Sequence, residues 1–303
     1  MRIVILAGGT GSAKLLTGLD RLIDRFTVVS NVGDNIWLYG LYICPDIDIA
    51  TYCLAGILDN KGWGIKDDTF NALAQLSVLG FPTWFRVGDK DLAVHIIRTK
   101  MIREGKRLTD VTKYLTRSLN VKHEVIPCTD SEVTTYIKTD MGSLHLQEFW
   151  VREQGKPRVY GIEYKGGEDA EPSPETVKSL QDAERIILCP ANPVSSIGPI
   201  LAIKGMKDAI LSSKARKVAI SPLVGSSPIS GPAGKFMEAT GARVDCVGVA
   251  KLYEDLIDVL MVNTNDQGFC SEIRSLGIEC IPTNIIMKSI EDQVRLAAEV
   301  LRV

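Results

Sequence analysis

Short apolar runs alternate with amphipathic stretches at both ends of the chain. The β-branched run at residues 3–6 is followed by a glycine-rich turn, and leucine and isoleucine then recur at helical spacing over residues 15–23. A second run at 27–30 predicts a βαβ unit and hence a parallel sheet. Further strands are predicted at 185–189, 217–221, 245–249, 259–263 and 278–282.

The middle of the chain has a different pattern. Helical stretches are predicted near 69–79, 89–104 and 108–119, and strand-like runs follow at 123–128, 133–139, 143–151 and 158–164. We therefore predict an α/β protein with a Rossmann-like parallel sheet that carries a large α+β insertion. The predicted core comprises residues 1–40 and 182–303, and the insertion comprises residues 41–181.

Charge and composition exclude several classes of protein. Among 303 residues, 35 Lys and Arg balance 37 Asp and Glu, so no overall positive field favours nucleic acid or a membrane surface. No apolar segment is long enough to span a bilayer without charges. The seven cysteines form no C-x-x-C pair, which predicts reduced, mostly buried thiols. We expect a cytoplasmic protein without nucleic-acid or membrane partners.

A glycine loop links the first predicted strand to the first predicted helix. Main-chain N–H groups at such a junction bind phosphate, and the candidate residues are Gly8, Gly9, Thr10, Gly11 and Ser12. The third glycine of a dinucleotide fingerprint is missing, and no acid follows the second strand, so NAD binding is disfavoured. The spacing around Lys14 also fails to match a P-loop. The alternative is a purely structural tight turn.

Three other loops are predicted at the same edge of the sheet. Asn31 follows the second strand, Asn192 and Ser195 follow the strand ending at residue 189, and Ser221 ends the next strand. Open α/β sheets bind ligands at this carboxyl edge. Each loop taken singly could be a capped helix start, but together they favour a nucleotide-sized site.

Three carboxylates follow the second predicted strand. Asp46 and Asp48 would point to the same side of an extended segment, and Asp34 lies just before them. Magnesium is bound through one or two carboxylates together with substrate phosphates, so acids beside a phosphate loop suit Mg²⁺. The alternative is that these acids are turn or cap residues.

The segment at 84–99 offers further candidates. Trp84 can stack on a ring, and Lys90 is a candidate ligand contact at a helix start. Asp91, His95 and Arg98 share one face of the predicted helix. Because His95 has no partners at metal-binding spacing in the sequence, we expect a hydrogen-bonded structural histidine.

The segments "AGGTGSAKLL", "VVSNVGDN", "ICPDIDIATYCLAG", "WFRVGDKDLAVHIIRT", "CPANPVSSIGPIL" and "SPLVGSSPISGPAGKFM" resemble the 2-phospho-L-lactate transferase family, nearly from end to end. The resemblance implies a transferase of coenzyme F-420 biosynthesis. Such enzymes move a 2-phospholactyl or phosphoenolpyruvyl group from a guanosine diphosphate-linked donor to the ribityl hydroxyl of the deazaflavin Fo. They release GMP, use Mg²⁺ and form homodimers.

The resemblance also implies roles for residues. The glycine loop and the loops at Asn31, Asn192 and Ser221 would hold the guanosine diphosphate part, and Asp48 and Lys90 stand where the family contacts Fo. Trp84 would wall the ring. From charge and spacing we assign the metal to Asp34 and Asp46, and the catalytic carboxylates to Asp48 and Asp46. A related branch of nucleotide-sugar-binding regulators of the gluconeogenesis-factor type is the alternative; it typically departs from "CPDIDIATY", which is intact here.

Overall fold

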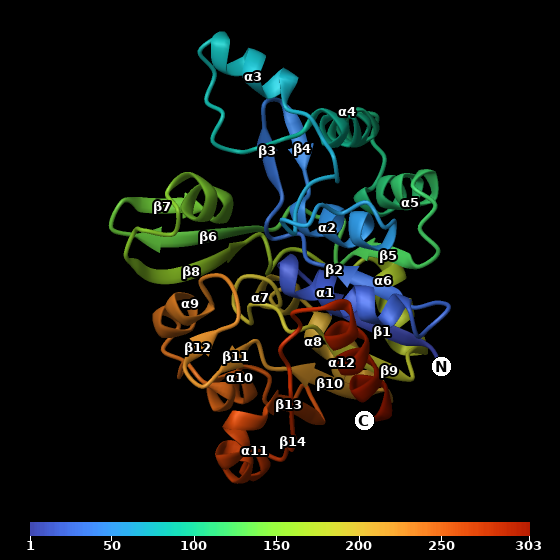
Figure 1. Cartoon of the computed structure of the whole chain (residues 1–303), viewed down its shortest axis with the longest axis vertical. Helices are drawn as coiled ribbons and strands as arrows, with labels where there is room; N and C mark the ends of the chain where they lie inside the picture. The colour runs from blue at the N-terminus through green and yellow to red at the C-terminus, as the bar shows by residue number, and fades with distance from the viewer.

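Seven parallel strands form the central sheet in a computed structural model that describes residues 1–303 (Figure 1). Most residues of these strands are buried, as expected for apolar runs covered by helices on both faces. The predicted Rossmann-like α/β fold is confirmed. In spatial order the strands are β14 (Glu279–Thr283), β13 (Val259–Asn263), β10 (Arg216–Ile220), β9 (Arg185–Leu188), β1 (Ile3–Ala7), β2 (Thr27–Ser30) and β5 (Glu124–Pro127).

The order of the strands reverses beside β1. From β1 the chain runs outward through β2 to β5, and it later returns to β9 on the other side of β1 and continues through β10, β13 and β14. The loops that leave β1 and β9 therefore diverge. Such a topological switch point opens a crevice at the carboxyl ends of the strands.

Helices cover the sheet, and α1 packs against both α2 and the C-terminal α12. The larger helices are α1 (Gly9–Asp20), α2 (Pro45–Leu54), α3 (Asn71–Val78), α4 (Asp89–Arg103), α5 (Leu108–Ser118), α6 (Pro174–Asp182) and α12 (Ile290–Arg302). The shorter ones are the π-helix η1 (Glu148–Arg152), α7 (Gly198–Leu201), α8 (Met206–Ser212), α9 (Ala233–Ala239), α10 (Cys246–Leu252), the 3₁₀ helix η2 (Thr264–Phe269) and α11 (Cys270–Ser275).

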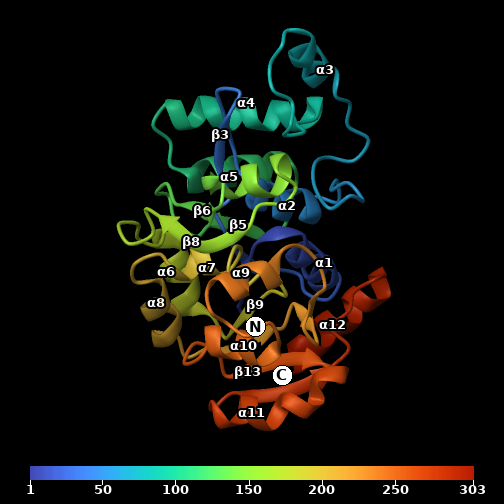
Figure 2. The ribbon, with the colours of Figure 1, turned by 90° about the vertical axis from the view of Figure 1, so that its left-hand side faces the viewer.

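The insertion packs on the core rather than standing apart from it. Strand β5 lies within 41–181 yet completes the central sheet beside β2, so the predicted boundary does not separate two sheets. One continuous apolar core also joins Val133, Ile137 and Phe149 to the central strands. In Figures 1 and 2 α3 lies at the end of the molecule opposite α11, with α4 next to it. The small sheets comprise β6 (Thr134–Thr139), β7 (Gly142–His145) and β8 (Val159–Lys165); β3 (Ile36–Leu38) and β4 (Leu41–Ile43); and β11 (Leu223–Val224) and β12 (Ser227–Pro228).

Two local predictions were wrong. Residues 245–249 form the start of α10 instead of a strand, because the Asp245 side chain accepts a hydrogen bond from the Gly248 N–H at 2.9 Å and caps the helix. The strand expected at 143–151 ends at His145 and gives way to η1. The strands expected near 185–189, 217–221, 259–263 and 278–282 are all present.

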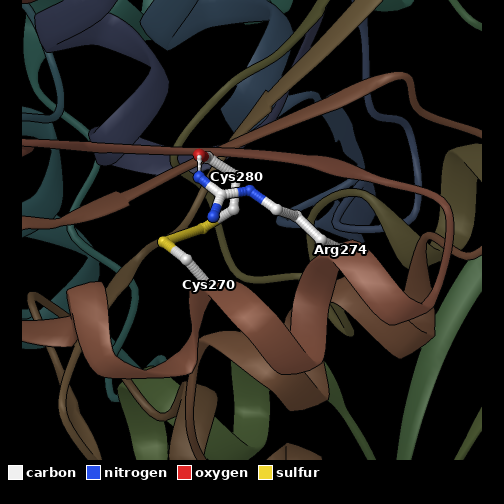
Figure 3. The surroundings of a disulfide bond; sticks show 3 residues. All are labelled: Cys270, Arg274 and Cys280. Carbon is white, nitrogen blue, oxygen red and sulfur yellow. Dashed lines mark hydrogen bonds between the residues drawn. A yellow bond between two sulfur atoms is a disulfide. The ribbon is translucent and has the colours of Figure 1, made fainter.

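Two cysteines are paired. Cys270 at the start of α11 forms a disulfide with Cys280 on β14, and the Arg274 guanidinium donates to the Cys280 carbonyl oxygen at 3.2 Å (Figure 3). The expectation that all seven thiols are reduced was therefore wrong for this pair, which the sequence separates by ten residues. Five cysteines remain free.

No helix in the structure combines the length and apolar character needed to cross a membrane.

Candidate active site

A cavity of about 450 Å³ lies at the topological switch point. Its walls include residues directly after β1, β9 and β10, so the carboxyl edge of the sheet forms its floor. The insertion supplies the opposite wall through the start of α2, the start of α4 and the segments at 84–86 and 146–151. Small-molecule sites commonly occupy about 300–1,000 Å³, so the cavity is of the size expected for a ligand site.

The glycine loop leaves two N–H groups free. Helix α1 already begins at Gly9, so the loop is shorter than predicted. The Gly9 N–H donates to Asp46 Oδ1 at 2.7 Å, whereas the N–H groups of Thr10 and Gly11 have no protein acceptor. All three residues line the cavity. Free N–H groups in the first turn of a helix of this length, facing a cavity, suit an anionic ligand.

The glycines also have a packing role. A Cβ at Gly8 would lie 2.8 Å from Ser196 Cβ and 2.9 Å from Asp46 Oδ2, and a Cβ at Gly11 would collide with the Pro190 carbonyl oxygen. Side chains here would push the loop after β1 away from the loop after β9. The phosphate-loop interpretation and the structural-turn interpretation are therefore compatible.

Asp34 and Asp46 form a pair joined by Asn31. The Asn31 Nδ2 donates to Asp34 Oδ1 and to Asp46 Oδ2, both at 2.8 Å, and Gln147 Nε2 lies 3.4 Å from Asp34 Oδ2. Burial raises the pKa of Asp46 to about 6. Burial and then the neighbouring charge of Asp46 raise the pKa of Asp34 well above its usual range. Because no protein cation forms an ion pair with either carboxylate, the pair is a candidate cation site.

The prediction that Asp46 and Asp48 point to the same side of an extended segment was wrong. The segment forms α2, with Pro45 at its first position and both acids in its first turn, where they complement the helix dipole. Positions two apart in a helix diverge by about 200°. Asp46 therefore contacts Gly9 and Asn31, whereas Asp48 faces α4.

A second buried cluster surrounds Asp48. Arg98 is only 1% exposed and pairs with Asp48 Oδ1, and its Nη1 contacts His95 Nδ1 at 3.0 Å. Asp91 Oδ1 lies 3.4 Å from His95 Nε2 and accepts from the Tyr52 hydroxyl at 2.6 Å. Burial raises the pKa of Asp48, and the Arg98 charge opposes that rise. The shared helical face predicted for Asp91, His95 and Arg98 is confirmed.

Aromatic rings and two cations complete the cavity. Trp63, Trp84 and Trp150 line it, and Trp84 meets Phe85 edge to face with ring centroids 5.7 Å apart. Flat rings of this kind favour a planar ligand. The cations are Lys14, whose Nζ contacts the Met287 carbonyl oxygen at 3.3 Å, and Arg86, which lies over the Phe70 ring; neither forms an ion pair with a carboxylate.

Most of the predicted site residues lie together. Those that line the cavity are Gly8, Gly9, Thr10, Gly11, Asp34, Asp46, Asp48, Trp84, Asn192 and Ser195. Ser12 and Asn31 lie behind the wall, where Ser12 Oγ bonds to Gly8 and Asn31 holds the carboxylates. Ser221 is also buried behind it, with its Oγ accepting from the Leu223 N–H at 3.2 Å.

Lys90 lies apart from the other predicted site residues. It does not line the cavity, because its Nζ donates to the carbonyl oxygens of Lys66 at 3.2 Å and Asp67 at 2.8 Å. It is also one position away from Asp91, whose side chain turns inward to the cluster. Lys90 therefore lies outside the cavity of this structure, and its contact with a ligand stays a prediction.

Several cavity residues were not singled out from the sequence as site residues. Lys14 lies about one turn into α1, just after the glycine loop. Its closeness to that loop in the sequence could have indicated that it lines the same cavity. Tyr52 falls on the same helix as Asp48. Gln147 and Trp150 lie around η1, where an expected strand concealed them, and the sequence carries no signal for their position.

The fold and the cavity define a Rossmann-like α/β protein with a small-molecule site at its switch point. Among solved structures, a member of the UPF0052 family from Bacillus halodurans superposes with a TM-score of 0.68 at 15% identity, covering 99% of this chain and 98% of that chain, so the two share a fold. The sequence identifies the family. Residues 3–285 match the family described as 2-phospho-L-lactate transferase CofD, and the chain belongs to that family.

Curated relatives agree over their full length. A 2-phospho-L-lactate transferase from Methanopyrus kandleri is 41% identical and covers 100% of this chain and 97% of its own. The enzyme of that name from Methanosarcina mazei is 38% identical, with 99% of both chains covered. A phosphoenolpyruvate transferase from Streptomyces coelicolor is 37% identical, over 99% of this chain and 97% of its own. The protein is thus a transferase of this family.

Proposed function

We propose that this transferase moves a 2-phospholactyl or phosphoenolpyruvyl group from a guanosine diphosphate-linked donor to the ribityl hydroxyl of the deazaflavin Fo, releasing GMP, in coenzyme F-420 biosynthesis. We also propose that it acts as a homodimer. The observation that carries the reaction is the meeting, in one cavity, of a tryptophan wall, a glycine loop with free N–H groups and two sets of carboxylates.

The two parts of the cavity suit two substrates. Thr10 and Gly11 offer free N–H groups, and Lys14 adds a cation without a carboxylate partner, which suits the diphosphate of the donor. Trp63, Trp84 and Trp150 offer apolar ring faces, which suit the deazaflavin ring. The names of the relatives support a phosphorylated three-carbon acid as the group transferred.

The residues present fit a magnesium ion. Asp34 and Asp46 supply hard oxygen ligands, Asn31 holds both in place, and their raised pKa values reflect burial without a compensating protein cation. We propose that these two carboxylates hold Mg²⁺. When bound, Mg²⁺ would neutralise charge on the diphosphate.

Asp48 then has the role of proton acceptor. Its Oδ1 is occupied by Arg98, but its Oδ2 has no hydrogen-bond partner. The ribityl hydroxyl attacks the phosphorus that carries the acid group, the bond from that phosphorus to the oxygen of the GMP phosphate breaks, and GMP leaves with the electron pair. The hydroxyl proton passes to Asp48 Oδ2. The remaining side chains orient the substrates, which is the main source of catalysis in phosphoryl transfer.

The test is a titration with Fo followed by its own fluorescence, and then turnover with the guanosine-linked donor with and without Mg²⁺. We expect saturable binding by the parent and turnover only with Mg²⁺. Trp84→Leu should weaken Fo binding by about tenfold, in keeping with the energy of an aromatic pair. Trp37→Leu is the matched control, because Trp37 is 44% exposed and does not line the cavity.

Absence of Fo binding by folded protein would overturn the proposal and would favour the regulatory alternative, which a uridine diphosphate sugar would then reveal by binding. Equal losses in Trp84→Leu and Trp37→Leu would show that Fo binds outside this cavity.

A further inference from the structure

Arg98 is an unusual residue in this protein, because its guanidinium is almost fully buried. It comes from the middle of α4 and bridges two groups: it pairs with Asp48 Oδ1, and its Nη1 lies 3.0 Å from His95 Nδ1. A guanidinium has only donors, so the hydrogen bond to His95 Nδ1 must be accepted by that nitrogen. Arg98 therefore fixes the orientation of the carboxylate and of the imidazole at the same time.

The histidine has a carboxylate near its other nitrogen, although Nε2 makes no hydrogen bond. With Nδ1 acting as acceptor, the ring hydrogen of a neutral imidazole lies on Nε2, which is 3.4 Å from Asp91 Oδ1. Asp91 accepts in turn from the Tyr52 hydroxyl at 2.6 Å. The result is a chain of buried contacts from Tyr52 on α2 through Asp91, His95 and Arg98 on α4, back to Asp48 on α2.

This chain leaves one buried carboxylate oxygen without a hydrogen bond. Asp48 Oδ2 is buried and has no hydrogen-bond partner, although the residue lines the cavity. It lies 3.7 Å from His95 Nδ1, a nitrogen already used by Arg98. A buried carboxylate oxygen without a donor is costly to keep, so its retention beside the cavity points to a hydrogen bond made with a ligand.

A metal ion is a poorer explanation of the same cluster. Ligand atoms of Asp48, Asp91 and His95 do lie within 4.8 Å of one another. However, the two carboxylates lie next to opposite nitrogens of the imidazole, and the Arg98 cation already neutralises Asp48. A cation in this position would meet the positive charge of Arg98.

We propose that Arg98 and His95 are positioning residues that hold Asp48 with its Oδ2 directed at the attacking hydroxyl. The inference rests on the proposed function. Arg98 does not line the cavity, whereas His95 does. We assign neither to the reacting atoms: Arg98 acts by occupying Oδ1 and fixing the carboxylate plane, and His95 acts by holding Arg98. Loss of this alignment lowers the rate of the transfer step while leaving the donor site at the glycine loop intact.

The experiment compares two substitutions of His95. In His95→Asn the side-chain oxygen stands as many bonds from the backbone as Nδ1 and can still accept from Arg98, whereas His95→Leu cannot. We expect His95→Leu to lower kcat about 100-fold with the donor KM unchanged, which is the loss typical of a misplacement of about 1 Å, and His95→Asn to recover most of that loss. Arg98→Lys, which keeps the charge but cannot bridge both partners, gives the same loss if His95→Leu does not fold.

The readout that separates positioning from a structural role is non-additivity. In an Asp48→Asn background, adding His95→Leu should lower kcat no further, because His95 acts only through Asp48. Ile96→Ala is the control on the same helix, since Ile96 is 50% exposed and outside the cavity.

Three outcomes would each overturn the inference. The first is a kcat equal to that of the parent in a folded His95→Leu or Arg98→Lys variant. The others are no recovery of kcat in His95→Asn and multiplicative losses of kcat in the double variant. A parent protein that does not convert Fo would instead overturn the proposed function, and the positioning role with it.

Discussion

The pair formed by Asp34 and Asp46 should destabilise the protein when no metal is bound. Replacing Asp34 by Asn keeps the shape of the side chain and keeps an acceptor for Asn31 Nδ2. Gln147 can turn its amide to accept from the new NH₂ group. The substitution thus removes a charge and leaves the hydrogen bonds in place, so we expect Asp34→Asn to raise the free energy of unfolding of the metal-free protein at neutral pH.

The magnitude follows from the geometry. Both carboxylate oxygens lie 2.8 Å from the same Asn31 nitrogen, so they cannot be farther apart than twice that distance. Two unit charges about 5 Å apart repel by about 3 kcal/mol at an effective dielectric constant of about 20. Asp34 is only partly buried at the cavity wall, and solvent screens part of this repulsion. We therefore expect a gain of about 1–2 kcal/mol.

The gain should depend on pH in one direction. Raised pKa values mean that the folded protein binds more protons than the unfolded chain, so the stability of the parent falls as the pH rises through this window. The window begins near the ordinary value of 3.8 and extends to about 6 for Asp46, and the pKa of Asp34 also lies well above its ordinary value. The advantage of Asp34→Asn should be absent below the window and increase as the pH rises through it.

Urea unfolding in the presence of a chelator, followed by tryptophan fluorescence at several pH values, measures this difference. Asp89→Asn is a control of opposite sign, because hydrogen bonds from Thr69, Ala72 and Asn71 lower the pKa of Asp89 to about 2; that variant should be less stable than the parent at neutral pH. A stability of Asp34→Asn that is lower than that of the parent at neutral pH, or a gain that is the same at every pH, would refute the reasoning.

Two further predictions concern parts of the fold that support the cavity. Gly11→Ala should lower the free energy of unfolding by about 1–3 kcal/mol, because its Cβ would overlap the Pro190 carbonyl oxygen, and thermal unfolding would detect it; an unchanged melting temperature would contradict the close approach of the two loops. Cys270→Ser should lower stability by about 2.5 kcal/mol without changing kcat, since the disulfide lies outside the cavity; a loss that also appears in the parent on adding a reductant would confirm its origin, and no loss in either would contradict it.

Much of the fold could be predicted from the sequence because buried parallel strands have a strong local signature. The runs at β1, β2, β9, β10 and β13 are mostly buried and apolar and match the prediction. The edge strand β14 also matches it, although only its Cys280 is buried. The segment at 245–249 has the same apolar character, but there the Asp245 cap decides in favour of a helix. Strand β5 is predicted as a strand of the insertion, and its pairing with β2 in the central sheet is not encoded locally.

The site was predicted less completely because its parts come from distant segments. The spacing of Asp91, His95 and Arg98 identified a shared helical face, but their partner Asp48 lies on another helix and no local pattern connects the two. The prediction of an extended segment at Asp46 and Asp48 overlooked two signals for a helix start. These signals are Pro45 at the first position of α2 and acids in its first turn. That error explains why Asp46 and Asp48 were expected on one side.

The first turn of α2 gives its two acids different tasks. Asp46 faces the glycine loop and meets another carboxylate with no protein cation, whereas Asp48 faces α4 and is neutralised by Arg98. A metal ion should therefore be drawn to the first and not to the second. We expect Mg²⁺ to raise the melting temperature of the parent and of Asp48→Asn alike, but not that of Asp46→Asn, while both variants lose turnover. Loss of the Mg²⁺ effect in Asp48→Asn would instead show that the two carboxylates act as one ligand set, and the separation produced by the helix would then have no functional meaning.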